Sequence, residues 1–403
     1  MVSLDLACPD PAELGAALDE AVSDRVASLI GAQDPTLWGP DAQSEAAKRL
    51  SWVSLATTSR PLVDEIVALR DEVRARGLDH VVLCGMGGSS LAPEVICKSA
   101  GVELTVLDSS QPDMVRAAMA DRLERSVVVV SSKSGGTVET DSQRRTYEQA
   151  FRDAGLDPAD HLVIVTDPGS PLFDEATGAG YRVFTADPEV GGRYSALTAF
   201  GLVPSGLAGV DVGGLLDDAE AAHDLVFTDS PENPALRLGV LLGVANRHRV
   251  DKLVLTDTRG HGMGDWIEQL VAESTGKIER GVLPVVVPSA DAPNFSPSTA
   301  DSVVVAIGGS QAPAAESGFA AALDGALAAE MLMWEVATAV AGRLIGINPF
   351  DQPDVESAKA AARELLDSSS TPPQPDAVDG EVSIFGSSAT TVTEAVNAVL
   401  DQV

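Results

Sequence analysis

Short continuous apolar runs alternate with longer amphipathic stretches along most of the chain. Between residues 77 and 205 the apolar runs are HVVLCG, ELTVLD, SVVVVSS, HLVIVTD and YRVFTA, and stretches such as TVETDSQRRTYEQAFRDAG separate them. Continuous apolar strands that alternate with helices are typical of a parallel sheet covered on both faces. The pattern therefore predicts an α/β fold with three layers, in which helices flank a sheet.

A second series of the same kind begins after a glycine-rich stretch at 206–214. The predicted strands are KLVLTD, VLPVVVP and SVVVAIGG, and helical spacing covers PALRLGVLLGVANRH and GDWIEQLVAES. One long helix is predicted over 313–345 and a shorter one over 353–367. We therefore expect two α/β units of similar construction, at 77–205 and 206–367.

The two ends of the chain differ from these units. Residues 1–76 predict a helical segment, with Asp10 as the N-cap of a helix that starts at Pro11. The Pro- and Ser-rich stretch 368–380 predicts a linker. Residues 381–403 predict one strand and one helix, too few to bury a core. We expect them to be the start of an incomplete C-terminal unit.

Composition excludes several classes of partner. The chain has 60 acidic against 27 basic residues and a formal charge of −33, which disfavours nucleic acid and anionic membrane surfaces. Its three cysteines are odd in number and lack C-x-x-C spacing, which argues against disulfides or a zinc site. No apolar run approaches the roughly 20 residues of a membrane span. We expect a cytoplasmic protein.

Two strands end in glycine- and serine-rich turns that lead directly into helices, in VVLCGMGGSSLAPEV and VVVVSSKSGGTVET. Glycines allow close backbone approach, hydroxyls donate hydrogen bonds, and a helix start adds free N–H groups, a combination that suits a phosphate. GMGGSS lacks the G-x-G-x-x-G spacing of dinucleotide sites, and SSKSGGT lacks the nucleotide-triphosphate loop pattern. For either turn alone, an ordinary tight strand-to-helix turn explains the composition equally well.

Five segments in a fixed order resemble the sugar isomerase (SIS) domains of the phosphoglucose isomerase (glucose-6-phosphate isomerase) family. They are GMGGSSL, SSKSGGT, GGRYSALTAFGL, ESTGK and GINPFDQPDVESAK. The chain is most similar to the form found in actinobacteria and in transaldolase fusions. The resemblance implies two SIS domains, a small sugar phosphate as ligand, a homodimer, and no metal or cofactor.

The resemblance also implies roles for particular residues. The substrate phosphate would be bound by four residues of the second turn: Ser132, Lys133, Ser134 and Thr137. The sugar would be contacted by Gly88 and Ser89 of the first turn.

Four further residues complete the implied site. Glu273 would be the base, Arg193 would stabilise the negative intermediate, Gln352 would help to bind substrate, and Lys359 would assist ring opening.

The residue types fit this chemistry. Aldose–ketose isomerisation needs one base to move a proton between C2 and C1 through an enediolate. Glu273 shares helical spacing with Trp266 and Leu270, which predicts a partly apolar face. Arg193 follows two glycines and keeps its charge at any physiological pH. The alternatives for these two are a solvated glutamate and a surface ion pair.

The implied reaction is the interconversion of glucose 6-phosphate and fructose 6-phosphate. In the family a histidine assists ring opening, and none of the five histidines here follows Glu273. We therefore expect a C-terminally truncated isomerase, whose histidine motif would lie beyond Lys359. The alternatives are a noncatalytic sugar-phosphate-binding protein and an isomerase of mannose 6-phosphate or an amino sugar phosphate.

Overall fold

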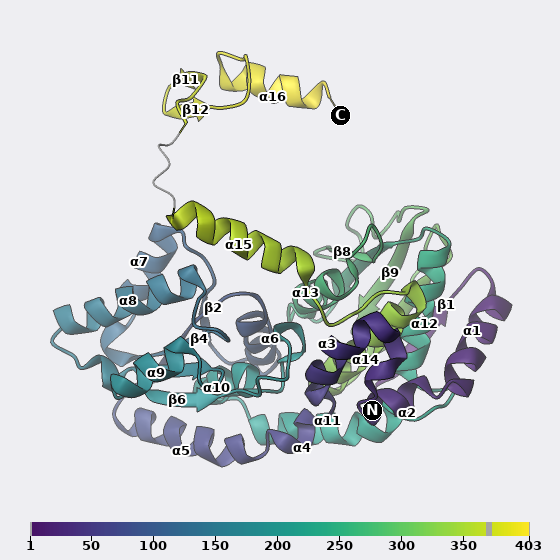
Figure 1. Ribbon diagram of the computed structural model, residues 1–403, viewed down its shortest axis with the longest axis horizontal. Helices are drawn as coiled ribbons and strands as arrows, with labels where there is room; N and C mark the ends of the chain where they lie inside the picture. The colour runs from purple at the N-terminus through teal and green to yellow at the C-terminus, as the bar shows by residue number, and fades with distance from the viewer. Residues whose placement is uncertain (1, 368–372, 403) are drawn as a thin grey trace. The chain divides into compact units, whose positions relative to one another are not determined.

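The computed structural model describes residues 2–367 and 373–402. The chain forms two compact units, residues 1–351 and 352–403, and each is described by itself. The first unit holds both large sheets, which Figure 1 labels together with the helices. No helix of the described residues is both long and apolar enough to cross a membrane.

The first sheet consists of five parallel strands in the order β3-β2-β4-β5-β6. Their bounds are β2 (His80–Gly85), β3 (Thr105–Leu107), β4 (Ser126–Ser131), β5 (Leu162–Thr166) and β6 (Arg182–Thr185). The chain moves from β2 to one neighbour, β3, and then to the other, β4. The strand order therefore reverses between β2 and β4, and ligands of open α/β sheets bind at such a point.

Residues of one strand alternate between the two faces of this sheet. Val81 and Leu83 join the large core of the first unit, whereas Val82 and Cys84 belong to a second apolar cluster with Tyr147. Successive side chains of a strand point to opposite faces, so both faces are covered. The predicted three-layer arrangement is confirmed.

The second sheet has the order β1-β10-β9-β7-β8. Its strands are β1 (Ser3–Ala7), β7 (Lys252–Asp257), β8 (Leu283–Val286), β9 (Ser302–Ile307) and β10 (Ala320–Asp324). All pairs are parallel except β1 with β10, which is antiparallel. The prediction of helices alone for residues 1–76 missed β1, because its stability depends on a partner strand more than 300 residues away.

The long helix predicted over 313–345 is wrong. Residues Ala320–Asp324 form β10, and the helix α14 spans only Leu327–Ile345. The strand sequence AAALD is rich in alanine, the best helix former, so local propensity favoured a helix. Parallel pairing with β9 overrides that preference.

The helices of the first unit surround the two sheets. Their bounds are α1 (Pro11–Ser23), α2 (Val26–Gly31), α3 (Pro40–Arg49), α4 (Leu55–Thr58), α5 (Pro61–Ala75), α6 (Leu91–Ser99), α7 (Pro112–Ala120), α8 (Val138–Asp153), α9 (Pro171–Gly178), α10 (Ala199–Ala208), α11 (Val212–Val226), α12 (Pro234–Arg247), α13 (Met263–Thr275) and α14. The Asp10 side chain accepts hydrogen bonds from Ala12 and Glu13 N–H, so the predicted N-cap of α1 is confirmed.

Helix α14 is the centre of the second half of the core. Most of its residues are buried, and α12 packs closely along it. A Cβ added to Gly239 of α12 would lie 2.6 Å from the carbonyl oxygen of Ala337, so the two helix backbones can approach only because Gly239 lacks a side chain.

The second unit contains α15 (Pro353–Asp367), a hairpin of β11 (Ala377–Asp379) with β12 (Val382–Ile384), and α16 (Val392–Leu400). The strand and helix expected over 381–403 are both present. The predicted linker 368–380 ends in β11, and its residues 368–372 lie outside the described part of the chain. The predicted boundaries of the two SIS domains stay a prediction.

Candidate active site

Two turns lie beside each other at the carboxyl ends of neighbouring strands. Gly85, the last residue of β2, pairs with Ser131, the last residue of β4. The β2–α6 turn (residues 86–90) and the β4–α8 turn (residues 132–137) therefore start from adjacent positions. Both lie at the strand-order reversal where a ligand is expected.

The β4–α8 turn presents free backbone donors at the start of a long helix. Among the hydrogen bonds of the described residues, the N–H groups of Lys133, Ser134, Gly135 and Thr137 have no acceptor. Gly135 has φ +70°, a conformation that other residues adopt at a cost. Such N–H groups at a helix N-terminus bind anions, because they add to the positive end of the helix dipole.

The side chains of this turn divide into two groups. The Ser132 hydroxyl lies 3.4 Å from the Thr137 hydroxyl, and Thr137 makes no side-chain cap to α8. The Ser134 hydroxyl accepts a hydrogen bond from the N–H of Gly136. The Lys133 ammonium instead lies 2.8 Å from the Asp167 carboxylate. The predicted phosphate residues thus share one turn, but the Lys133 side chain is paired within the protein.

The β2–α6 turn packs against the segment that carries Arg193. A Cβ added to Gly88 would lie 2.2 Å from the carbonyl oxygen of Gly192, and one added to Gly87 would lie 2.6 Å from Gln269 Nε2. The half-buried Ser89 follows in the same 3-10 turn. Only glycine permits this approach, which brings the first turn against both the Arg193 segment and helix α13.

Glu273 lies in the last turn of α13 and contacts two donors. Gln269 Nε2 donates to Glu273 Oε1 at 3.0 Å, and Arg193 Nη1 lies 3.4 Å from Oε2. The side chain of Glu273 is 29% exposed, whereas that of Arg193 is 4% exposed. A partly accessible carboxylate is thus held beside a buried guanidinium, an arrangement that suits a base next to a stabilising positive charge.

Several further contacts orient Arg193. Its Nε donates to the Ser274 hydroxyl at 3.0 Å, and its Nη2 donates to the carbonyl oxygen of Pro349 at 3.0 Å. The next residue, Tyr194, stacks on Trp52 with ring centroids 5.1 Å apart. Burial raises the pKa of Tyr194 to about 12, so it stays neutral.

Lys277 of the ESTGK motif holds the segment that follows α14. Its ammonium contacts the carbonyl oxygens of Asn348 and Asp351 and the Asp351 carboxylate, the latter two at 2.6 Å. Burial lowers the pKa of Lys277. Arg193 and Lys277 therefore fix the same segment, residues 348–351, from two sides.

The remaining two predicted residues belong to the second unit. Gln352 is its first residue, and Lys359 lies within α15. The side chain of Lys359 lies outside what the structure describes. The contacts above join Gly88, Arg193 and Glu273 directly, and the strand pairing places the β4–α8 turn beside them.

Sequence reasoning missed four residues that contact the site: Gln269, Ser274, Asp167 and Tyr194. Gln269 could have been found, because it precedes Glu273 by one helical turn and such side chains are neighbours. The partners of Asp167 and Ser274 come from segments that local patterns do not connect.

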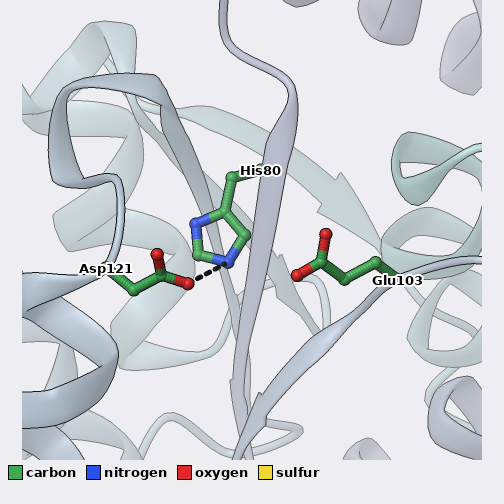
Figure 2. A group of neighbouring side chains, drawn as sticks. All are labelled: His80, Glu103 and Asp121. Carbon is green, nitrogen blue, oxygen red and sulfur yellow. Dashed lines mark ion pairs between the residues drawn. The ribbon is translucent and has the colours of Figure 1, made fainter.

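A histidine cluster outside this site does not form a convincing metal centre. Figure 2 shows His80 between the carboxylates of Glu103 and Asp121. Both ring nitrogens of His80 already lie within 2.9 Å of hydroxyl oxygens from β3 and β4. Arg122 pairs with Glu103 at 2.6 Å and Asp121 at 2.8 Å, so a metal would have to displace it. The cluster also sits at the amino end of β2, opposite Gly85.

Parallel sheets that carry phosphate-type turns at the reversal point define a SIS-type sugar phosphate fold. A family model described as phosphoglucose isomerase matches residues 67–288, and the chain belongs to this family.

The relatives agree with this assignment. The glucose-6-phosphate isomerase of Geobacter sulfurreducens is 32% identical over 253 residues, 56% of this chain and 46% of the relative. That of Thermus thermophilus is 31% identical over 248 residues, 59% of this chain and 58% of the relative. The chain thus spans about half the length of these curated relatives.

A solved structure supports the fold. The crystal structure of a glucose-6-phosphate isomerase from Chlamydia trachomatis superposes with a TM-score of 0.73 at 20% identity, covering 91% of this chain and 88% of that one.

Proposed function

We propose that this protein interconverts glucose 6-phosphate and fructose 6-phosphate by proton transfer between C2 and C1. The observation that carries the proposal is the Glu273 carboxylate, held between Gln269 Nε2 and Arg193 Nη1 beside the two glycine-rich turns. The named activity of the relatives supports the same reaction.

Each group has a chemical role in this reaction. The free N–H groups of the β4–α8 turn and the hydroxyls of Ser132 and Thr137 bind the substrate phosphate. Glu273 takes the proton from C2 of the open-chain aldose and returns it to C1. Arg193 stabilises the enediolate, because its charge is fixed close to Glu273.

Two further roles come from the family resemblance alone. Gln352 helps to bind substrate, and Lys359 assists ring opening. A homodimer and a cytoplasmic location are likewise part of the proposal.

Exchange of the C2 proton with solvent tests the assignment of the base. With glucose 6-phosphate in D₂O, the wild-type chain should exchange this proton, and Glu273→Gln should slow the exchange by about 10³-fold. Glu268→Gln is the matched control, because it removes the same charge from an exposed position of α13. Undiminished exchange in Glu273→Gln would refute the assignment.

A second candidate is a noncatalytic sugar-phosphate-binding protein. It is favoured by the β4–α8 turn, whose donors form one continuous stretch that needs no other part of the site. This candidate predicts that calorimetry detects fructose 6-phosphate binding while proton exchange is absent in the wild type. Parallel assays with mannose 6-phosphate and glucosamine 6-phosphate test the remaining alternatives.

A further inference from the structure

The side chain of Lys133 points away from the role that its motif suggests. Its ammonium lies 2.8 Å from Asp167 Oδ2 and donates to the carbonyl oxygens of Pro188 at 3.1 Å and Val190 at 3.0 Å. An ammonium has three N–H donors, and these three acceptors match that number. The charge of Lys133 is therefore used within the protein, while its backbone N–H remains available to a phosphate.

Asp167 is built to hold this ammonium in place. It follows β5, and its backbone N–H donates to the carbonyl oxygen of Lys133 at 3.2 Å. Its side chain is only 15% exposed, and that of Lys133 is 31% exposed. Burial raises the pKa of the Asp167 carboxyl and the ammonium of Lys133 opposes this shift. The two residues thus contact each other through both backbone and side chain.

The segment held by Lys133 leads to Arg193. A second cation also grips it, since Arg49 Nη1 donates to the carbonyl oxygen of Pro188 at 3.1 Å. Residues 191 and 192 are glycines, which leave the backbone before Arg193 with unusual conformational freedom. A flexible pair of residues directly before a buried guanidinium needs an external restraint to keep that guanidinium in one position.

We propose that Lys133 and Asp167 are positioning residues that clamp segment 187–192 and so keep Arg193 beside Glu273. The kinetic consequence rests on the isomerase function proposed above, whereas the clamp itself is a property of the folded chain. In this role the Lys133 ammonium couples the phosphate turn to the group that stabilises the enediolate, without contacting substrate.

Hydrogen exchange tests the clamp independently of activity. The amides of Val190 and Tyr194 donate to Asp187 and Gly191 within the segment. In Lys133→Met and Asp167→Asn they should exchange about 10-fold faster, the effect of losing roughly 1.4 kcal/mol of local restraint. Lys98→Met is the matched control, because Lys98 is a half-exposed lysine paired only with Glu94. Unchanged exchange in both clamp variants would overturn the proposal.

Kinetics test the consequence. Lys133→Met and Asp167→Asn should each lower kcat about 10-fold and leave the inhibition constant of inorganic phosphate within about 2-fold. In an Arg193→Gln background the same changes should have little further effect, because they act through Arg193.

The competing role is a direct contact between the ammonium and the phosphate. It would raise the inhibition constant of phosphate in Lys133→Met and leave kcat of Asp167→Asn unchanged, and that result would overturn the proposal. Asp167→Asn preserves side-chain shape and covers the case in which Lys133→Met does not fold. An inactive wild type would refute the proposed function, while the exchange experiment would still test the clamp.

Discussion

The two sheets of the first unit repeat one strand order but end differently at their reversal points. In the first sheet, β4 leads through a turn with free N–H groups directly into α8. In the second, the corresponding strand β9 leads into a loop, and the side chain of Arg259 lies against Gly308 at its end. Arg259 donates to Glu330 at 2.6 and 3.0 Å.

The difference shows how similar topology can give one open site and one closed one. A helix that starts at the reversal point presents donors to an anion. Where no helix starts, a buried Arg259–Glu330 pair with Asp257 and Asp324 nearby occupies the same place. The second sheet contributes to the candidate site through α13 instead, whose last turn carries Glu273.

Breaking the Arg259–Glu330 pair should have the largest effect on stability. Glu330 is fully buried and the Arg259 side chain is 21% exposed, so Glu330→Gln leaves a largely buried charge without its partner. We expect the free energy of unfolding to fall by about 3 kcal/mol, as measured by urea denaturation. Binding of fructose 6-phosphate should not change, because the pair lies outside the phosphate turn.

The control for this prediction lies on the same helix. Asp24→Asn breaks the pair between Asp24 and Arg343 of α14, whose side chains are 43% and 28% exposed. We expect a loss below about 1 kcal/mol. Equal losses in the two variants would mean that the Arg259–Glu330 pair is not the plug described above.

Two glycines with the same backbone conformation distinguish the open turn from the closed one. Gly135 has φ +70° and an added Cβ would lie 2.5 Å from Leu172 Cβ, whereas Gly260, after β7, has φ +72° with nothing within 4 Å. Gly135→Ala should distort the donors and weaken fructose 6-phosphate binding about 100-fold. Gly260→Ala should cost only about 1 kcal/mol of stability. Equal affinities by calorimetry would contradict the phosphate assignment.

Much of the fold follows from local sequence. The runs HVVLCG and SVVVVSS were found as the strands β2 and β4, and the turns after them do lie side by side. These features depend on period, glycine and helix starts within about 20 residues. The predicted helix over 313–345 failed because alanine favours a helix locally, whereas β10 is stabilised by pairing with β9.

The candidate site is less accessible to sequence reasoning. Glu273 and Arg193 were singled out through their motifs, and their side chains do lie 3.4 Å apart. The partners that orient Arg193 come from Ser274 and Pro349, which are 81 and 156 residues away. The pairing of Lys133 with Asp167 also went unseen, since a lysine in a phosphate-type turn suggests a ligand contact.

The hydroxyl of Thr137 gives a smaller test of the open turn. Thr137 makes no cap to α8, so its hydroxyl can donate to a bound phosphate. Thr137→Val should weaken fructose 6-phosphate binding about 10-fold, the effect of one hydrogen bond to a charged group. Thr258→Val is the control in the second sheet, where the hydroxyl donates to Ile307 O at 2.9 Å. An equal loss of affinity in both variants would argue against a local effect.

The gentlest test of the closed half uses a second glutamate of α14. Glu335 is buried, and unlike Glu330 it has no ion-pair partner among the described residues. Burial raises the pKa of Glu335 well above its usual 4.5, so the folded protein keeps this proton after the unfolded chain has lost it.

The stability that Glu335 contributes is therefore fully present below pH 4.5 and is lost as the pH rises toward the pKa of the folded state. Glu335→Gln should remove this loss, so the difference in unfolding free energy between variant and wild type should grow in favour of the variant. The expected slope is about 1.4 kcal/mol per pH unit. Urea denaturation from pH 5 to 8 measures it. A difference that is constant with pH, or that grows in favour of the wild type, would mean that Glu335 is ionised in the folded protein and has a partner.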